Sequence, residues 1–436
     1  MVQLLKPGRM TAVALGALMI GVFGGLVRSD VPRDGSGQLA AAPGGGSVPS
    51  RQGLNPAPGP GAGHSPTTAA PPSPSTPQPA IPAPTAPTAP PRPTPEQQLA
   101  ALTLEQRVGQ LFMTAAQANG SDTDAVAALL GNHVGNIYLA GRSQAGVAAT
   151  ADLVAKLKAA APAASNGGIP VFVATDQEGG KVQVLSGPGF SAIPAALAQG
   201  GSSPAQLRAD ARTWGSELLQ AGVNVDLAPV LDTVPGPDFA PSNLPIGAFQ
   251  RQFGFTPEAV SEHGNAMASG LRDAGVAPVA KHFPGLGRVG PNTDVSANVH
   301  DTETSRTDPY LAPFHDAIKS GVRWVMLSSA YYDRIDPANV APFSPVVMRT
   351  MLRSEAGFTG IIVSDDLCNA KQLAAWPLGD RATKFIGAGG TMVLCADPAS
   401  VAAMYAQTLQ RSQADPGFRQ QVDAAALTVL KVKAGK

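Results

Sequence analysis

Residues 279–294 read VAKHFPGLGRVGPNTD, and they decide between two α/β folds. The stretch contains GLGRVG (285–290), which matches the spacing G-x-G-x-x-G of a dinucleotide-binding turn. Such a turn needs a helix that opens within the glycines, so that its N-terminus meets the pyrophosphate. Here Gly290 is followed by PNTD (291–294), and no helical period begins before about Asp308. We therefore expect the glycines to shape a mobile loop rather than to bind a dinucleotide.

This stretch begins with one of eight short β-rich runs that are separated by helical patterns. Most of the runs are continuously apolar, as expected for parallel strands that are covered on both faces. Among the helical patterns, 256–275 has Thr256 as its N-cap, Pro257 at its first position and Gly275 at its end. The expected strands are 108–113, 133–140, 169–176, 223–230, 277–283, 323–329, 360–366 and 390–396.

Eight strands that alternate with helices predict a (β/α)8 barrel over residues 94–436, a length that is normal for this fold. An open doubly wound sheet is the alternative, because periodicity alone does not separate the two. The first strand is the least defined, since LEQRVGQLFM (104–113) also fits a helix.

Two segments precede the expected barrel. In residues 1–28, Lys6 and Arg9 come before the uncharged run 10–27, which is typical of a signal peptide or a membrane anchor. Residues 29–93 are dominated by Pro, Ala, Gly, Ser and Thr, and they predict a disordered linker. We expect an exported protein that is either secreted or tethered to a membrane at the outer face of a bacterial cell envelope.

Composition excludes several function classes. The net charge of +0 indicates no bias toward nucleic acid. The six His and two Cys residues lack ligand spacing, so we expect neither a metal site nor a cofactor. No H-E-x-x-H, G-x-S-x-G or G-K-[ST] motif is present. We expect a monomer.

Polar residues gather where the apolar runs end, and in a barrel the C-terminal strand ends meet on the catalytic face. Asp365, in VSDDL (363–367), is the main candidate, with Asp366 and Asp176 as possible second acids. Two carboxyl groups about 5–5.5 Å apart can act as nucleophile and acid on a glycosidic bond. A helix-capping turn at 364–366 is the alternative. The full set is Asp176, Asp232, Lys281, His282, Ser329, Asp365 and Asp366.

Five motifs occur in a fixed order: ATDQEGGKVQVL (174–185), NVDLAPVLD (224–232), IGAFQRQFG (246–254), AKHFPGLG (280–287) and IIVSDDL (361–367). With them the chain resembles family 3 glycoside hydrolases, in their single-domain β-N-acetylglucosaminidase branch. The resemblance implies a (β/α)8 barrel and retaining hydrolysis through a covalent glycosyl-enzyme. It places Asp365 at the nucleophile, and it places Asp176, Arg251, Lys281 and His282 at sugar-binding positions.

The chemistry of these residues agrees with the implied roles. Asp176 can accept bonds from two hydroxyls, while Lys281 and Arg251 can donate to sugar oxygens and keep Asp365 ionised. Neutral His282 can donate one bond and accept another. Alternatively, the charges pair with one another to stabilise the barrel mouth, and both can hold together.

The acid/base departs from the family pattern. The family's loop usually reads K-H-F-P-G-H-G and then D-S-H, whose last His is the acid/base; here Leu286 replaces the first of these His residues, and Ser296 aligns with the last. A Ser hydroxyl cannot deliver a proton near neutral pH, which leaves Asp294 or His300. Multidomain relatives take this residue from a later domain, for which the 40 residues after Ala396 are too few.

We therefore expect a glycosidase that removes terminal β-linked sugars, N-acetylglucosamine above all, from peptidoglycan fragments or cell-surface glycans. Without an acid/base it would act slowly or only on good leaving groups, or it would be a catalytically impaired glycan-binding barrel of the cell envelope. Cys368 follows the seventh expected strand, and Cys395 lies at the end of the eighth. Two buried thiols are favoured over a disulfide, which export would permit.

Overall fold

The computed structural model describes residues 93–435. The expected export segment and the linker as far as residue 92 lie outside the described residues. In the described part of the chain, no helix combines the length and the apolar character needed to span a membrane.

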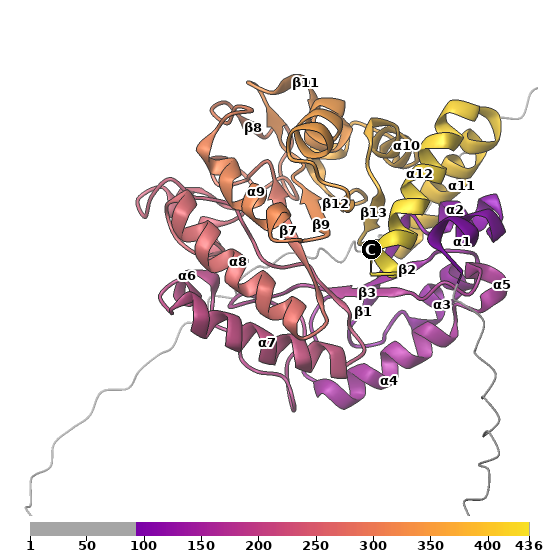
Figure 1. The fold of residues 1–436 in the computed structure, drawn as a ribbon, viewed down its shortest axis with the longest axis horizontal. Helices are drawn as coiled ribbons and strands as arrows, with labels where there is room; N and C mark the ends of the chain where they lie inside the picture. The colour runs from indigo at the N-terminus through magenta and orange to yellow at the C-terminus, as the bar shows by residue number, and fades with distance from the viewer. Residues whose placement is uncertain (1–92, 436) are drawn as a thin grey trace, which may run out of the picture. The chain divides into compact units, whose positions relative to one another are not determined.

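Eight parallel strands form a closed barrel, in the order β1-β13-β12-β9-β7-β6-β3-β2 (Figure 1). Closure comes from the pairing of β1 with β13, in which Phe112 lies opposite Val393. The expected barrel is therefore confirmed, and the open doubly wound sheet is excluded. The strands are β1 (Phe112–Gln117), β2 (Asn136–Ala140), β3 (Phe172–Thr175), β6 (Val225–Asp226), β7 (Ala277–Phe283), β9 (Trp324–Leu327), β12 (Ile361–Asp366) and β13 (Met392–Cys395).

Seven of the eight barrel strands lie within their expected ranges. The first strand was predicted wrongly at 108–113. Residues Leu104–Gly109 form helix α2, and β1 begins only at Phe112. The Thr103 side chain accepts from the Gln106 N–H, and the Gln106 side chain accepts from the Thr103 N–H. This capping box satisfies two donors at the start of the helix, so it outweighs the β-rich composition of the run.

Helices pack around the outside of the barrel (Figure 1). As predicted, α8 begins after Thr256, whose side chain accepts from the Ala259 N–H, with Pro257 as its first residue. The helices are α1 (Pro95–Ala101), α2 (Leu104–Gly109), α3 (Thr123–Gly131), α4 (Gly146–Ala159), α5 (Ala163–Asn166), α6 (Ala196–Gln199), α7 (Pro204–Gln220), α8 (Pro257–Asp273), α9 (Ala312–Lys319), α10 (Leu378–Ala388), α11 (Pro398–Ala414) and α12 (Pro416–Lys433).

Shorter elements are inserted between the barrel strands and the helices. Two small sheets, β4-β5 and β11-β10-β8, come from loops that follow barrel strands. The small strands are β4 (Gln177–Gly179), β5 (Val182–Gln183), β8 (His300–Asp301), β10 (Tyr331–Tyr332) and β11 (Asp336–Val340). The remaining helical segments are the short 3-10 helices η1 (Ala240–Ser242), η2 (Gly247–Phe249), η3 (Pro309–Leu311), η4 (Ala341–Phe343) and η6 (Lys371–Leu373), and the π-helix η5 (Val346–Glu355).

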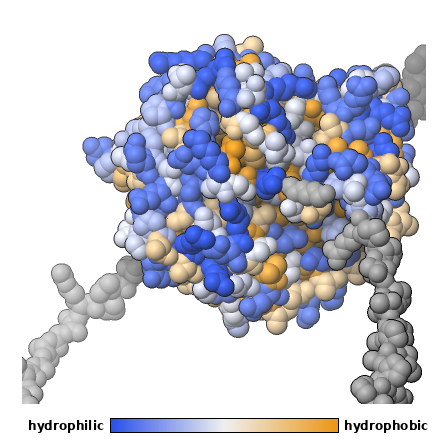
Figure 2. All heavy atoms as spheres, in the orientation of Figure 1, coloured by the Kyte–Doolittle hydropathy of each residue, from blue (hydrophilic) through white to orange (hydrophobic). Residues whose placement is uncertain are grey.

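Apolar side chains from the strands pack together as one buried cluster that includes Met113, Phe172, Val279, Trp324 and Met326. Phe172 and Trp324 meet edge to face, with ring centroids 4.9 Å apart. The barrel is thus a packed core and not a pore, so chemistry belongs at the ends of the strands. On the outer surface, hydrophilic residues predominate over the face seen in Figure 2, with apolar ones between them.

The glycine stretch carries no helix where a dinucleotide would need one. Between Gly285 and Asp308 the chain forms only the short strand β8, and the next helical turn, η3, begins at Pro309. The GLGRVG sequence is therefore a loop that follows β7, and no helix N-terminus stands ready for a pyrophosphate.

The two cysteines form a disulfide, so the expectation of two buried thiols was wrong. Cys368 and Cys395 have Cα atoms 5.2 Å apart. Cys368 lies just after β12 and Cys395 is the last residue of β13, and these two strands pair, with Asp366 opposite Leu394. This register sets the two Cβ atoms within bridging distance, which the sequence separation alone does not reveal.

Candidate active site

Strands β2, β3 and β7 bring three polar side chains together at the barrel mouth. Asp176 directly follows β3, and its Oδ1 accepts from Lys281 Nζ at 2.6 Å. Its Oδ2 accepts from the hydroxyl of Tyr138 on β2 at 2.8 Å. Lys281 is only 2% exposed, whereas Asp176 is half-buried. The lysine therefore has a fixed place, and the aspartate presents a carboxylate to whatever enters.

Glu178, in β4, joins Lys281 to Arg251. Its Oε1 lies 2.5 Å from Lys281 Nζ, and Arg251 donates to both carboxylate oxygens, Nε to Oε2 at 2.8 Å and Nη2 to Oε1 at 2.7 Å. Burial of Glu178 opposes its ionisation, but Arg251 and Lys281 outweigh burial and lower its pKa to about 2. In Lys281, burial is outweighed in the same way by Asp176 and Glu178, which raise its pKa. Both cations are therefore held charged.

Sequence reasoning missed Glu178. It lies within the EGG of the 174–185 motif, but its carboxylate precedes two glycines and belongs to no periodic pattern. The charged residues predicted for the site do form ion pairs: Arg251 pairs with Glu178, and Lys281 pairs with Asp176. The motif itself was the only signal that could have identified it.

His282, the next residue on β7, is oriented by Asp232. Its Nδ1 lies 2.7 Å from Asp232 Oδ2, and because a carboxylate only accepts, Nδ1 carries the proton. The Nε2 atom faces Arg251 Nη2 at 3.5 Å. Asp232 also accepts from the Leu286 N–H at 2.7 Å, so it holds the start of the glycine loop. In its neutral form, His282 therefore offers an acceptor to the mouth.

The two aspartates that end β12 have different surroundings. The Asp366 carboxylate accepts from the N–H groups of Cys368 (2.9 Å), Ala396 (3.0 Å) and Asn369 (3.3 Å). Burial and the charge of Asp365 raise the pKa of Asp366. Asp366 therefore makes the capping hydrogen bonds that were the alternative interpretation of residues 364–366. Among the described residues, Asp365 accepts only the Asp366 N–H, at 2.9 Å, and its carboxylate is otherwise free for chemistry.

Asp294, on the glycine loop, stands beside these carboxylates. The residue is exposed at the surface. Although the residue reaches the surface, neighbouring protein atoms reduce the solvation of its carboxyl, and this desolvation together with the charges of Asp365 and Asp366 raises its pKa from 3.8 to about 7. Arg251 and His282 act in the opposite direction. Asp294 therefore titrates near neutral pH, within electrostatic range of Asp365.

His300 is held elsewhere. On β8, its Nδ1 lies 2.7 Å from Asp333 Oδ1, and its ring stacks on that of Tyr331 with centroids 4.5 Å apart. The side chain is exposed. Of the two candidate acids, Asp294 lies within electrostatic range of the predicted nucleophile Asp365, whereas His300 is engaged by Asp333 and Tyr331 in the small sheet.

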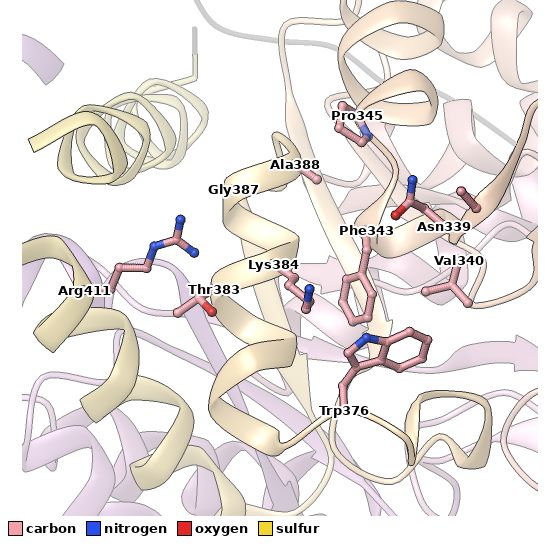
Figure 3. Close-up of a pocket in the computed structure, with 11 residues that line it drawn as sticks. Asn339, Val340, Phe343, Pro345, Trp376, Thr383, Lys384, Gly387, Ala388 and Arg411 are labelled. Atoms are coloured by element: carbon pink, nitrogen blue, oxygen red, sulfur yellow. The ribbon is translucent and has the colours of Figure 1, made fainter. Parts of the chain in front are cut away.

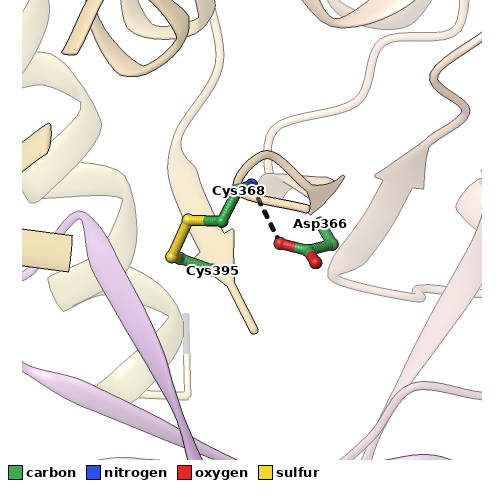
Figure 4. A group of neighbouring side chains, drawn as sticks. All are labelled: Asp366, Cys368 and Cys395. Carbon is green, nitrogen blue, oxygen red and sulfur yellow. Dashed lines mark hydrogen bonds between the residues drawn. A yellow bond between two sulfur atoms is a disulfide. The ribbon is translucent and has the colours of Figure 1, made fainter. Parts of the chain in front are cut away.

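Asp366, Cys368 and Cys395 lie close enough together to resemble a metal-binding set (Figure 4). Both sulfur atoms are, however, joined in the disulfide. A thiolate is the form of cysteine that binds metal, so these residues do not fit a metal site while they are oxidised.

A surface cavity of about 350 Å³ lies apart from these residues, between the β11–η4 segment and helices α10 and α11 (Figure 3). Its walls include Asn339, Phe343, Trp376, Lys384 and Arg411. None of the charged residues gathered at the strand ends lines it, so the candidate site remains the barrel mouth.

Comparison with known proteins identifies the family. The model described as "Glycosyl hydrolase family 3 N terminal domain" matches residues 103–432. The chain belongs to glycosyl hydrolase family 3. It is therefore a family 3 glycosidase barrel, as the ordered motifs predicted.

Similar proteins in this family carry consistent names. A "Beta-hexosaminidase" of Nitrosomonas eutropha is 34% identical over 304 residues, which cover 67% of this chain and 82% of that protein. Among solved structures, the Beta-N-acetylhexosaminidase of Beutenbergia cavernae has a TM-score of 0.75 and 50% identity, and the match covers 76% of this chain and 99% of that one. A family 3 beta-N-acetylglucosaminidase of Paenibacillus sp. has a TM-score of 0.68 and 30% identity, with 77% and 63% covered.

Proposed function

We propose that this protein is a retaining β-N-acetylhexosaminidase that removes terminal N-acetylglucosamine, with Asp365 as nucleophile and Asp294 as general acid and base. The observation that carries the proposal is the placement of Asp294: the Lys371 N–H, on the segment that follows β12, donates to the Asp294 carbonyl at 3.0 Å, and the nearby charge of Asp365 contributes to a raised Asp294 pKa of about 7. A protonated acid next to an ionised carboxylate is the pair that glycoside hydrolysis requires. The names of the similar family 3 proteins support the choice of sugar.

In the first step, an Asp365 oxygen attacks the anomeric carbon, and a covalent ester forms as the glycosidic bond breaks. The Asp294 proton passes to the departing oxygen, so that the leaving group departs as a neutral alcohol. In the second step, the Asp294 carboxylate takes a proton from water, whose oxygen attacks the same carbon and releases Asp365. Asp294 thereby regains its proton, and Asp365 is again a free carboxylate.

The remaining residues hold the sugar. Lys281 and Arg251, both fixed by Glu178, donate to hydroxyl oxygens, and Asp176 accepts from hydroxyls. His282 accepts through Nε2, because Asp232 occupies its Nδ1 proton. These cations and acceptors are already ordered before substrate enters, which lowers the cost of binding it.

The substrate source is a further part of the proposal. A basic segment, an apolar run and a Pro-rich linker at 1–93 support export, either as a secreted protein or with a membrane tether. Peptidoglycan fragments or surface glycans are then the N-acetylglucosaminides within reach. A glycan-binding barrel without turnover is the second candidate, and the replacement of the family's acid/base His favours it.

Aryl β-N-acetylglucosaminides with leaving groups of graded pKa separate the two candidates. We expect Asp365→Ala to abolish turnover. We expect Asp294→Ala to lose roughly 10²–10⁴-fold on poor leaving groups and little on good ones. The matched control His300→Ala should keep the wild-type dependence on leaving group. Equal inertness of wild type and Asp365→Ala, with sugar still bound, would leave only the binding protein.

A further inference from the structure

One buried residue, Gln372 in η6, closes both ends of the loop that carries Asp294. At the start of the loop, its backbone N–H donates to Thr293 O at 3.0 Å. At the end, its side-chain Oε1 accepts from the Val299 N–H at 3.0 Å, and its Nε2 donates to Val299 O at 3.1 Å. Gln372 is 4% exposed, and Thr293 and Val299 are each 1% exposed. The bonds are therefore shielded from water.

The backbone of Asp294 itself is held on both sides. Its carbonyl accepts from the Lys371 N–H at 3.0 Å, and its N–H donates to Asn292 Oδ1 at 2.9 Å. The glycine loop is consequently docked rather than mobile at this point, contrary to the expectation from its composition. Only rotation about the side-chain bonds of Asp294 remains to place its carboxyl.

Gln372 has in turn a fixed relation to the nucleophile. It lies seven residues after Asp365 along the chain. The segment between them is anchored by the three N–H groups that donate to Asp366 and by the Cys368–Cys395 disulfide. A residue on this segment therefore keeps a fixed position relative to β12, and the loop that Gln372 binds is fixed relative to β12 as well.

We propose that Gln372 is a positioning residue, which clamps the Thr293–Val299 loop so that the Asp294 carboxyl stays beside Asp365. The proposal rests on the proposed acid/base role of Asp294. Gln372 touches no reacting atom, and it acts by keeping proton donor and nucleophile in register. Without its amide, the buried Val299 N–H loses its partner and the end of the loop is released.

The first test is leaving-group dependence. We expect Gln372→Ala to lower kcat by roughly 10- to 100-fold on poor leaving groups, as a small misplacement of a catalytic group does, with little loss on good ones. The same change made in an Asp294→Ala background should cost nothing further, because the clamp acts through that carboxyl. The proposal is overturned if the activity losses of Gln372→Ala and Asp294→Ala add in full in the double variant. It is also overturned if Gln372→Ala loses as much activity on good leaving groups as on poor ones.

The conservative variant Gln372→Glu adds a pH signature. Its carboxyl, when protonated, can donate to Val299 O as the amide does, whereas the ionised form repels that oxygen. We expect its activity on poor leaving groups to approach wild type at low pH and to fall below it as the introduced group ionises. A constant ratio to wild type across pH would contradict this.

Asn166→Ala is the matched control. Asn166 is also 4% exposed and its side chain also binds backbone, at Ala161, Gly168 and Ile169, but it precedes β3 and lies away from the mouth. It should leave the leaving-group dependence unchanged. Hydrogen exchange supplies a readout apart from activity, since Gln372→Ala should accelerate exchange of the Val299 amide. If Asp294→Ala proves fully active, the acid/base assignment fails and the catalytic role of the clamp fails with it; unaltered Val299 exchange would reject the clamp itself.

Discussion

Removing the charge of Glu178 should destabilise the fold by an amount that its surroundings define. Glu178 is 3% exposed, and it binds Arg251 and Lys281 together. Its pKa falls from 4.5 to about 2 in the folded protein. At about 1.36 kcal/mol per pH unit, this difference corresponds to about 3 kcal/mol of stability at pH 7. Breaking a buried ion pair from one side costs a similar amount, about 3–5 kcal/mol.

The sign of the effect gives it a pH signature. Because the folded-state pKa of Glu178 is lowered, its contribution is fully present above about pH 4.5 and is lost as pH falls toward 2. We therefore expect Glu178→Gln to unfold with about 3 kcal/mol less free energy than wild type at pH 7. The gap should narrow steadily below pH 4.5.

Urea unfolding at several pH values between 7 and 3 measures this gap. Glu303→Gln is the matched control, because the Glu303 side chain is 67% exposed and lies 3.6 Å from Arg288. Exposed pairs of this kind contribute about 0–1 kcal/mol. A loss below about 1 kcal/mol for Glu178→Gln, or a gap that does not change with pH, would refute the reasoning.

Three further predictions concern Asp294, Asp226 and the disulfide. Because a general acid must be protonated, kcat/KM on poor leaving groups should fall as pH rises through about 7, and Asp294→Asn should lack this limb; a variant that keeps it would exclude Asp294. Burial raises the pKa of Asp226 to about 8, so the stability of wild type should decline between about pH 4 and 8, and Asp226→Asn, which keeps an acceptor for the Gln177 N–H, should escape the decline in thermal unfolding. If the stability of Asp226→Asn declines with pH as much as that of wild type, that account is wrong. Reduction of the disulfide, which links residues 27 apart, should cost about 3.5 kcal/mol in urea unfolding, and an unchanged midpoint would show that the bridge contributes nothing.

Much of the fold could be predicted because buried parallel strands leave a simple pattern. Continuous apolar runs marked seven strands in their places, and the capping box at Thr103 and Gln106 displaced the first. The site residues Asp176, Lys281 and His282 could be found because they sit where such runs end, and a barrel brings these ends together.

What the sequence could not reveal depends on contacts between distant segments. Gln372 and Val299 are 73 residues apart, and no local pattern links them. The disulfide depends on the register of β12 against β13, and Glu178 acquires its role only when Arg251 and Lys281 fold around it. The sequence left both Asp294 and His300 as candidate acids, and the docking of the loop separates them.

The central claim is that Asp365 forms the covalent bond to the sugar. Incubation with an activated, ring-fluorinated N-acetylglucosaminide should trap the glycosyl-enzyme, and peptide mapping by mass spectrometry identifies the labelled residue. The account predicts a label on Asp365, in the peptide that spans β12, and none in Asp365→Ala. A label on Asp294, Asp366 or any other side chain would contradict it.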